Sequence, residues 1–289
     1  MQRVNNHPAA IVNEAERDLH GLLICFMSGL DPLKLWRESL AIAQRILLEL
    51  LRRQRSLIFW VAFPVIVLVL NGLILAERLQ LTNAEAFAEA AAPTLVGAAL
   101  FFSCVGGSVA TVVAEREHRT LKRLFLTPLS GLSYFLGIFL AHALIGFTQA
   151  LLVLILSLAL GARFDGSLPG GAAIVLISIL SYVGVGFILG TQLARRTEDV
   201  NALVATFGVP LLILGGAFMP VSIFPESLRN LAEFNPIHHM NEALALVILA
   251  PGSSHDLWPH LNFLLVFSTV VVVSGWFSYW NMMMVERRL

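Results

Sequence analysis

Six stretches of the chain carry no Asp, Glu, Lys or Arg, and each is long enough to form a helix that crosses a membrane. The stretches are residues 56–76, 90–114, 124–162, 166–194, 200–225 and 257–285. A helix needs about 20 apolar residues to cross a hydrocarbon core roughly 30 Å thick. The stretch 124–162 exceeds one crossing, so we expect its first residues to lie outside the bilayer. The pattern predicts an all-α membrane protein with six transmembrane helices within residues 56–289.

The segment before the first span, residues 33–55, has the periodicity of an amphipathic helix. Its apolar positions recur at spacings of three and four and are Leu33, Trp36, Leu40, Ala43, Leu47 and Leu50. Its charged positions Lys34, Glu38, Arg45, Glu49 and Arg52 fall on the opposite side. A basic amphipathic helix beside a span is typical of an interfacial helix. We expect the headgroup layer to meet Trp36, Arg37, Arg45, Arg52 and Arg53. A plain membrane anchor and a docking surface both fit this pattern.

Residues 221–254, between the fifth and sixth stretches, are predicted to form short helices that do not cross the membrane. Pro225 and Pro236 interrupt the segment, because proline lacks the backbone donor that a helix needs. The uncharged piece from Ala243 onward is too short for a crossing and is typical of a re-entrant or interfacial segment. In the fourth stretch, Gly186 and Gly190 have the spacing that lets helices approach closely, and we expect packing within the chain.

The composition supports a membrane protein. The 289 residues are 57% hydrophobic and 13% charged, whereas a soluble domain carries about 25% charged residues. The mean hydropathy is +0.79. The formal net charge is zero, which gives no indication of a nucleic-acid-binding surface. The two cysteines, Cys25 and Cys104, suggest neither a disulfide framework nor a metal site.

The basic residues predict the orientation. Sixteen of the nineteen Lys and Arg residues lie in 1–55, 115–123, 193–199 and 286–289, which fall on one side of a six-span topology. The other side has only Arg78, Arg163 and Arg229. Because cytosolic loops are enriched in Lys and Arg, we expect both termini to be cytosolic, with residues 1–32 forming a cytosolic arm.

A dense charged segment, residues 115–123, separates the second and third stretches and carries six charged side chains in nine positions. Glu115 and Arg119 have the i, i+4 spacing of a helical ion pair. Leu121, Leu124 and Phe125 form an apolar patch, and Pro128 is expected to end the helix. A cytosolic loop would explain the basic residues alone. The acids and the apolar patch favour a short helix along the membrane that can transmit a push to both adjoining spans.

Several kinds of chemistry have little support. A P-loop needs glycine directly before its lysine, but Lys34 and Lys122 each follow leucine, so the chain has no such ATPase site. His142 could be a proton site, although a hydrogen-bonded packing role is more common for a buried histidine. His238 and Glu242, at i, i+4 and with His239 adjacent to the first, would place two metal ligands on one helical face, yet a third convergent ligand is not visible, and we predict no metal site.

The segment AEREHRTLKRLFLTPLS (114–130) resembles the signature of the type-2 ABC exporter permeases. In that family a coupling helix begins with Glu-Arg-Glu, ends with Thr-Pro-Leu-Ser and joins spans two and three. The amphipathic helix, GGAFMPVSIFP (215–225) and FNPIHHMNEAL (234–244) are also similar to family elements in order and spacing. The chain departs from the family pattern at Arg119, where glycine is frequent, and at Ala245, where arginine is frequent.

The resemblance implies a bacterial inner-membrane permease subunit that pairs with a second permease chain, as a homodimer or with a close homologue. Two copies of a separate ATPase would bind ATP and Mg and drive it. The coupling surface implied by the resemblance comprises Glu115, Arg116, Glu117, Arg119, Thr120, Leu121, Lys122, Arg123, Phe125 and Pro128. The permease itself would carry no catalytic residue and no cofactor.

The cargo is not encoded in any motif. Long uncharged spans suit an amphipathic, drug-like or lipid-like substrate, and a lipid-linked polysaccharide is the alternative within the family. A polysaccharide path would be expected to show aromatic rings, and the candidates are Phe101, Phe102, Phe207 and Phe218. Alternatives from other classes are a self-standing carrier or channel and a membrane enzyme that uses the 238–242 cluster.

Overall fold

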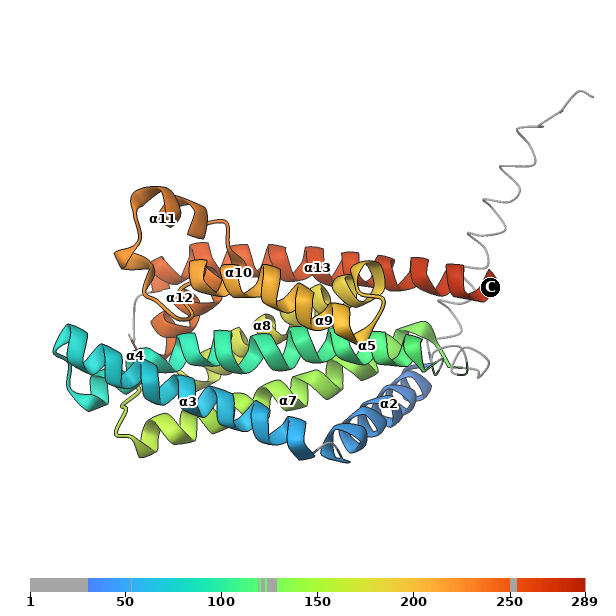
Figure 1. Cartoon of the computed structure of the whole chain (residues 1–289), viewed down its shortest axis with the longest axis horizontal. Helices are drawn as coiled ribbons and strands as arrows, with labels where there is room; N and C mark the ends of the chain where they lie inside the picture. Colours follow the sequence, from blue (N-terminus) through green and yellow to red (C-terminus); the bar gives the residue numbers. More distant parts are fainter. Residues whose placement is uncertain are drawn as a thin grey trace, which may run out of the picture.

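The computed structural model describes residues 31–52, 54–118, 120, 123, 129–249 and 254–288. Every regular element within these residues is a helix. Figure 1 shows the long helices side by side along the long axis of the molecule, with α2 at one end and α4, α11 and α12 at the other. We refer to these as the α2 end and the α12 end.

Six helices are long and apolar enough to cross a membrane, which confirms the predicted number of spans. They are Leu57–Leu79, Asn83–Glu117, Gly131–Ala159, Leu168–Leu193, Thr197–Leu214 and Asp256–Met282. The third begins at Gly131, as expected from the excess length of the stretch 124–162. The fifth ends at Leu214 rather than near residue 225, because Gly215 leaves helical geometry and Gly216 has a φ of 82°.

Span two is the central helix of the bundle. It consists of α4 (Asn83–Pro93), η1 (Thr94–Gly106), whose turns are of the wider π type, and α5 (Gly107–Glu117). Thr82 and Glu85 form a reciprocal capping box at its start. In its most apolar window 78% of the residues are buried, against 22% for span one. Side chains that reach the neighbouring spans therefore come mainly from this helix.

The segment before span one is a helix, α2 (Pro32–Arg52), and span one follows as α3 (Gln54–Leu79). The predicted helix is confirmed. The residues that α2 buries are Ser39, Ile42, Ala43 and Ile46. Leu33, Trp36 and Leu40 are exposed. An apolar stripe on a membrane-bound helix faces lipid as readily as protein, so periodicity alone did not identify the packing face.

Spans three and four are α7 (Gly131–Ala159) and α8 (Leu168–Ile188), the latter extended by the π-type turn η2 (Leu189–Leu193). The predicted packing role of Gly186 and Gly190 is confirmed. A Cβ at Gly186 would collide with the Ser108 side chain, and one at Gly190 would lie 3.1 Å from the Val112 Cβ. Spans two and four therefore pack within the chain through this pair of glycines.

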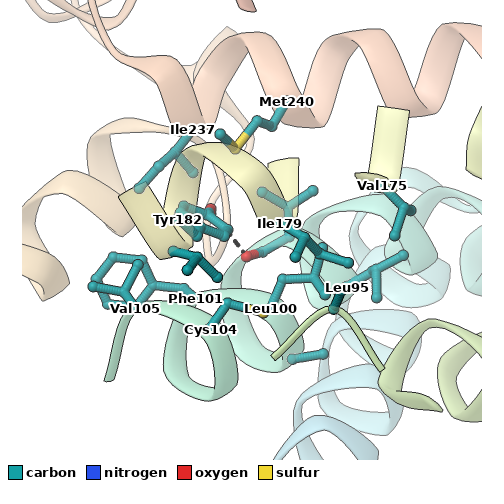
Figure 2. Close-up of a cluster of buried hydrophobic side chains, with 14 of the residues drawn as sticks. Leu95, Leu100, Phe101, Cys104, Val105, Val175, Ile179, Tyr182, Ile237 and Met240 are labelled. Atoms are coloured by element: carbon teal, nitrogen blue, oxygen red, sulfur yellow. Dashed lines mark hydrogen bonds between the residues drawn. The ribbon is translucent and has the colours of Figure 1, made fainter. Parts of the chain in front are cut away.

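Figure 2 shows the buried core where span four meets span two. Leu100, Phe101 and Cys104 of η1 lie against Ile179 and Tyr182 of α8, and Ile237 and Met240 approach from α12. The Tyr182 hydroxyl donates to the Val96 carbonyl at 3.1 Å (Figure 2). This hydrogen bond satisfies a polar group in an otherwise apolar core.

Span five consists of α9 (Thr197–Leu203), η3 (Val204–Gly208) and α10 (Val209–Leu214). The short elements after it, η4 (Val221–Ile223), α11 (Glu226–Ala232) and α12 (Pro236–Leu249), confirm the predicted proline-interrupted segment. Asn235 fixes the start of α12, because its side chain accepts from Ile237 N at 3.0 Å and donates to the Leu211 carbonyl at 2.7 Å. The Asn-Pro pair therefore attaches α12 to the end of span five.

Span six, α13 (Ser254–Arg288), packs along span four. Gly184 and Gly275 permit close contact, since a Cβ at Gly184 would lie 3.1 Å from the Val271 backbone. Tyr279 of α13 stacks on Tyr134 of α7 with ring centroids 5.3 Å apart. This aromatic pair lies beside the polar contacts at the α2 end.

Candidate functional site: a polar junction at the end of span two

The last turn of α5 carries Glu115, Arg116 and Glu117, and each of these side chains contacts a different part of the bundle. Their partners lie on α2, on α7, at the end of span four and at the start of span five. The charged segment thus begins inside span two. We call these three residues and their partners the polar junction.

Glu115 is the buried centre of the junction. Its side chain is 8% exposed, and its carboxylate accepts from the guanidinium of Arg45 on α2 and from the hydroxyl of Tyr134 on α7. A buried carboxylate is costly unless it is paired and hydrogen-bonded, and both partners meet that need. Glu115 therefore lies in the interior of the described bundle and not on an exposed face of the charged segment. The partner expected from spacing, Arg119, lies outside the described residues.

Arg116 reaches the end of span four. Its Nη1 donates to the carbonyls of Gly190, Thr191 and Ala194 at 3.1, 3.4 and 3.3 Å. The last carbonyls of a helix lack partners within it and carry partial negative charge, so a guanidinium there satisfies and stabilises the helix end. Arg116 therefore joins the ends of spans two and four.

Glu117 reaches span five. Its carboxylate accepts from the hydroxyl of Thr197, the first residue of α9. Asp199 closes the same turn by accepting from Arg195 N and Arg196 N, each at 2.9 Å. The short connection between spans four and five is thereby attached to span two.

A second polar contact joins α2 to span three. Glu38 accepts from Ser133 Oγ at 2.6 Å and from Ser130 N at 3.3 Å, where α7 begins. The two helices can approach because Gly137 has no side chain. A Cβ at that position would lie 2.6 Å from the Ile42 Cβ. The interfacial helix is thus held to the spans by Glu38 and Arg45. The sequence placed both residues on the charged side of this helix, opposite its apolar positions.

The remaining predicted coupling residues are only partly described. Thr120 is half-buried and Arg123 is exposed. Arg119, Leu121, Lys122, Phe125 and Pro128 lie outside the described residues, as does Arg53 of the predicted interfacial set. Trp36, Arg37 and Arg52 are exposed on α2, which is compatible with contact to a headgroup layer.

The four phenylalanines proposed for a translocation path lie in different environments. Phe101 is buried and meets Tyr182 edge to face at 5.7 Å, while Phe102 meets Phe63 of span one at 5.2 Å. Phe218 is partly buried against the core. Phe207 on span five is 63% exposed. Their role in transport stays a prediction.

Two of the intramembrane polar side chains form hydrogen bonds to backbone carbonyls of neighbouring spans. His142 Nδ1 lies 3.1 Å from the Ser103 carbonyl, and Gln149 donates to the Trp60 carbonyl at 3.0 Å. These contacts agree with the packing role favoured for His142 from the sequence.

A histidine cluster lies at the α12 end. His239 is 2.8 Å from both His260 Nδ1 and the Glu233 carbonyl, and Phe263 stacks on its ring at 3.9 Å. Burial and the neighbouring His239 lower the pKa of His238 below its ordinary value. Among the described residues no group of three or more His, Cys, Asp or Glu side chains is arranged to hold a metal.

Sequence reasoning missed several residues of the polar junction and of the contact between α2 and span three. Tyr134, Ser133 and Thr197 are ordinary polar residues at the ends of apolar stretches, and nothing local marks them as partners of a carboxylate. The available signal was position, since Thr197 lies between two predicted spans on the side that carries Glu115, and Ser133 and Tyr134 lie in the early part of a stretch whose start was expected outside the bilayer.

The fold and the junction define a multi-pass membrane protein whose amphipathic helix is attached to the ends of its spans. Residues 74–277 match the family described as ABC-2 family transporter protein. The chain belongs to this family.

Curated relatives agree with this assignment. The "Probable multidrug ABC transporter permease YbhR" of Escherichia coli is 31% identical over 157 residues, covering 54% of this chain and 42% of the relative. The "Inner membrane transport permease YhhJ" of Escherichia coli is 26% identical, covering 57% and 43%. The "Linearmycin resistance permease protein LnrN" of Bacillus subtilis is 24% identical, covering 58% and 44%. The chain thus matches less than half the length of these relatives.

Proposed function

We propose that this chain is the transmembrane permease subunit of an ABC exporter, driven by a separate ATPase subunit that docks at the α2 end. The observation that carries the proposal is the polar junction. It connects the interfacial helix to spans two, three, four and five at one end of the bundle, through Glu115, Arg116 and Glu117. A force applied at this end therefore reaches four spans.

The sequence indicates that a separate subunit supplies the energy for transport. The chain has no glycine-lysine pair and hence no P-loop, so the energy for transport comes from a partner. Two ATPase copies and a second permease chain complete the proposed assembly, in the bacterial inner membrane with both termini cytosolic. The asymmetry of Lys and Arg supports the orientation, because the described basic segments, on α2, at the end of α5, between spans four and five and at the end of α13, lie at the α2 end.

The junction residues act in this scheme as a transmission element. Glu115 and its partners hold α2 and α7 to span two, and Arg116 and Glu117 hold the connection between spans four and five. The docking contacts of the ATPase then belong to the exposed part of the charged segment, which includes Arg123. Because the junction is internal, its loss impairs transmission before it impairs docking.

The proposed cargo is an amphipathic, drug-like or lipid-like molecule. The names of two relatives refer to multidrug transport and to linearmycin resistance, which supports this class over a polysaccharide. The spans also offer few ionisable groups to a charged substrate.

Co-purification tests the proposal. A candidate ABC ATPase subunit is expressed with this chain, and the complex is isolated through a tag on the permease. We expect ATP hydrolysis by the complex and none by the permease alone. Transport by the permease alone in liposomes without ATP would contradict the proposal and favour a self-standing carrier.

A further inference from the structure

An apolar cavity of about 240 Å³ lies between spans three and four near the α12 end. Its walls come from α4, η1, α7, α8 and α12, and all fourteen lining residues are apolar or glycine. An ordered water needs two to four polar partners, so the cavity is unsuited to water. It exceeds the roughly 150 Å³ of an apolar protein cavity that binds benzene.

The position of α12 and the small size of two lining side chains account for this cavity. The loop after α7 is attached to the end of α12, because Gly166 N donates to the Ile248 carbonyl at 3.1 Å and Ser167 N to the Val247 carbonyl at 2.9 Å. These bonds hold α12 across the cavity. Ala150 and Ala172 line facing helices, and their small side chains leave the volume between them unfilled.

The cavity is bordered by lipid-facing residues. Leu151 of span three and Leu168 of span four line it and are 55% and 56% exposed. In a spanning helix, large exposed apolar side chains face hydrocarbon. The cavity is therefore accessible from the bilayer.

An exposed arginine is next in sequence to a residue that lines the cavity. Arg163 is exposed in the loop between α7 and α8 and directly precedes Phe164, which lines the cavity. A guanidinium suits phosphate recognition because it presents several donors in a planar fork.

We propose that this cavity is a phospholipid site, in which one acyl chain enters between spans three and four and the phosphate meets Arg163. The apolar wall suits the chain, the exposed leucines give it access, and the arginine suits the headgroup. None of Phe101, Phe102, Phe207 and Phe218 lines this cavity. The site is therefore separate from the proposed path of the cargo and does not depend on the proposed function.

The test uses the full chain in phosphatidylethanolamine–phosphatidylglycerol vesicles with a small fraction of a phospholipid that carries a diazirine near the end of one acyl chain. After illumination, mass spectrometry locates the labelled peptides. We expect labelling concentrated in residues 147–154 and 164–175. Ala172→Phe fills the cavity and should lower this labelling by about threefold or more, because a packed site has no room for both groups.

Ala173→Phe is the matched control, since Ala173 is the exposed neighbour of Ala172 on α8 and does not line the cavity. It should leave the labelling unchanged. Arg163→Gln should lower it, whereas Arg78→Gln, at another exposed arginine, should not. The proposal is overturned by labelling spread evenly over the lipid-facing helices or by equal effects of the two phenylalanine variants.

Discussion

Arg45 of the interfacial helix and Glu115 at the end of span two form an ion pair across 70 positions of sequence. The arginine lies on a helix outside the six spans and the carboxylate is buried within them. The hydroxyl of Tyr134 completes the contact from span three. One carboxylate thus fixes the position of α2 relative to the two spans that flank the charged segment.

Removing the carboxylate should destabilise the protein. Glu115→Ala leaves the Arg45 guanidinium and the Tyr134 hydroxyl without their partner, and we expect a loss of about 2–4 kcal/mol in the free energy of unfolding. Denaturation in detergent micelles measures it. A double-mutant cycle with Arg45→Met and Glu115→Gln should give a coupling energy of about 1–3 kcal/mol. Strict additivity of the two variants would show that the pair is energetically unimportant.

The contact of Arg116 with span four should depend on the guanidinium and not on charge alone. Arg116→Lys keeps the charge but replaces a planar fork by a single ammonium group, so we expect a loss of about 1–2 kcal/mol in stability. Arg123→Lys, at an exposed position of the same segment, is the control and should change stability by less than about 0.5 kcal/mol. Equal effects of the two substitutions would argue against the helix-end contact.

The approach of α2 to span three should require glycine at position 137. In Gly137→Ala the new Cβ would lie 2.6 Å from the Ile42 Cβ and 3.0 Å from the Ser39 carbonyl oxygen. We expect α2 to shift, at a cost of about 1–3 kcal/mol. Gly106→Ala is the matched control, because a Cβ there meets nothing within 4 Å. Cross-linking between cysteines introduced on α2 and α7 would detect the shift, and unchanged cross-linking with unchanged stability would refute the close contact.

Lowering the pH should reduce the stability of the protein through His238 at the α12 end. The pKa of His238 is lowered from its ordinary value of 6.5 by burial and by His239, while Glu233 opposes the shift. The carboxylate of Glu242 also lies 4.0 Å from this ring. Between the lowered pKa and about 6.5 the unfolded chain binds more protons than the folded chain, so stability falls as the pH falls through this window and levels off below it.

Thermal unfolding measured from pH 7.5 to pH 5 checks this dependence. His238→Gln should remove part of the decline in melting temperature. His118→Gln, at an exposed position at the α2 end, should leave the decline unchanged. A decline that is identical in all three proteins would exclude His238 as its source.

The sequence predicted the spans well and the junction poorly, for identifiable reasons. Bilayer thickness limits the length of an apolar helix, so the six crossings follow from charge-free stretches, and Pro225 and Pro236 mark where the short helices start. Helical periodicity placed Glu38 and Arg45 on a polar face. It could not reveal that this face meets Ser133 and Glu115, because those partners are 95 and 70 positions away. Polar contacts between distant segments depend on tertiary packing, which a local pattern does not encode.

The ratio of cargo exported to ATP hydrolysed most directly measures the transmission of force through the polar junction. The permease and its ATPase are reconstituted in liposomes with a drug-like amphipathic cargo, as wild type and as Arg45→Met. We predict that the variant still co-purifies with the ATPase and hydrolyses ATP, but exports about tenfold less cargo per ATP. A tenfold change corresponds to a typical coupling free energy between two sites. An unchanged ratio in the variant would contradict a role of the polar junction in transmission.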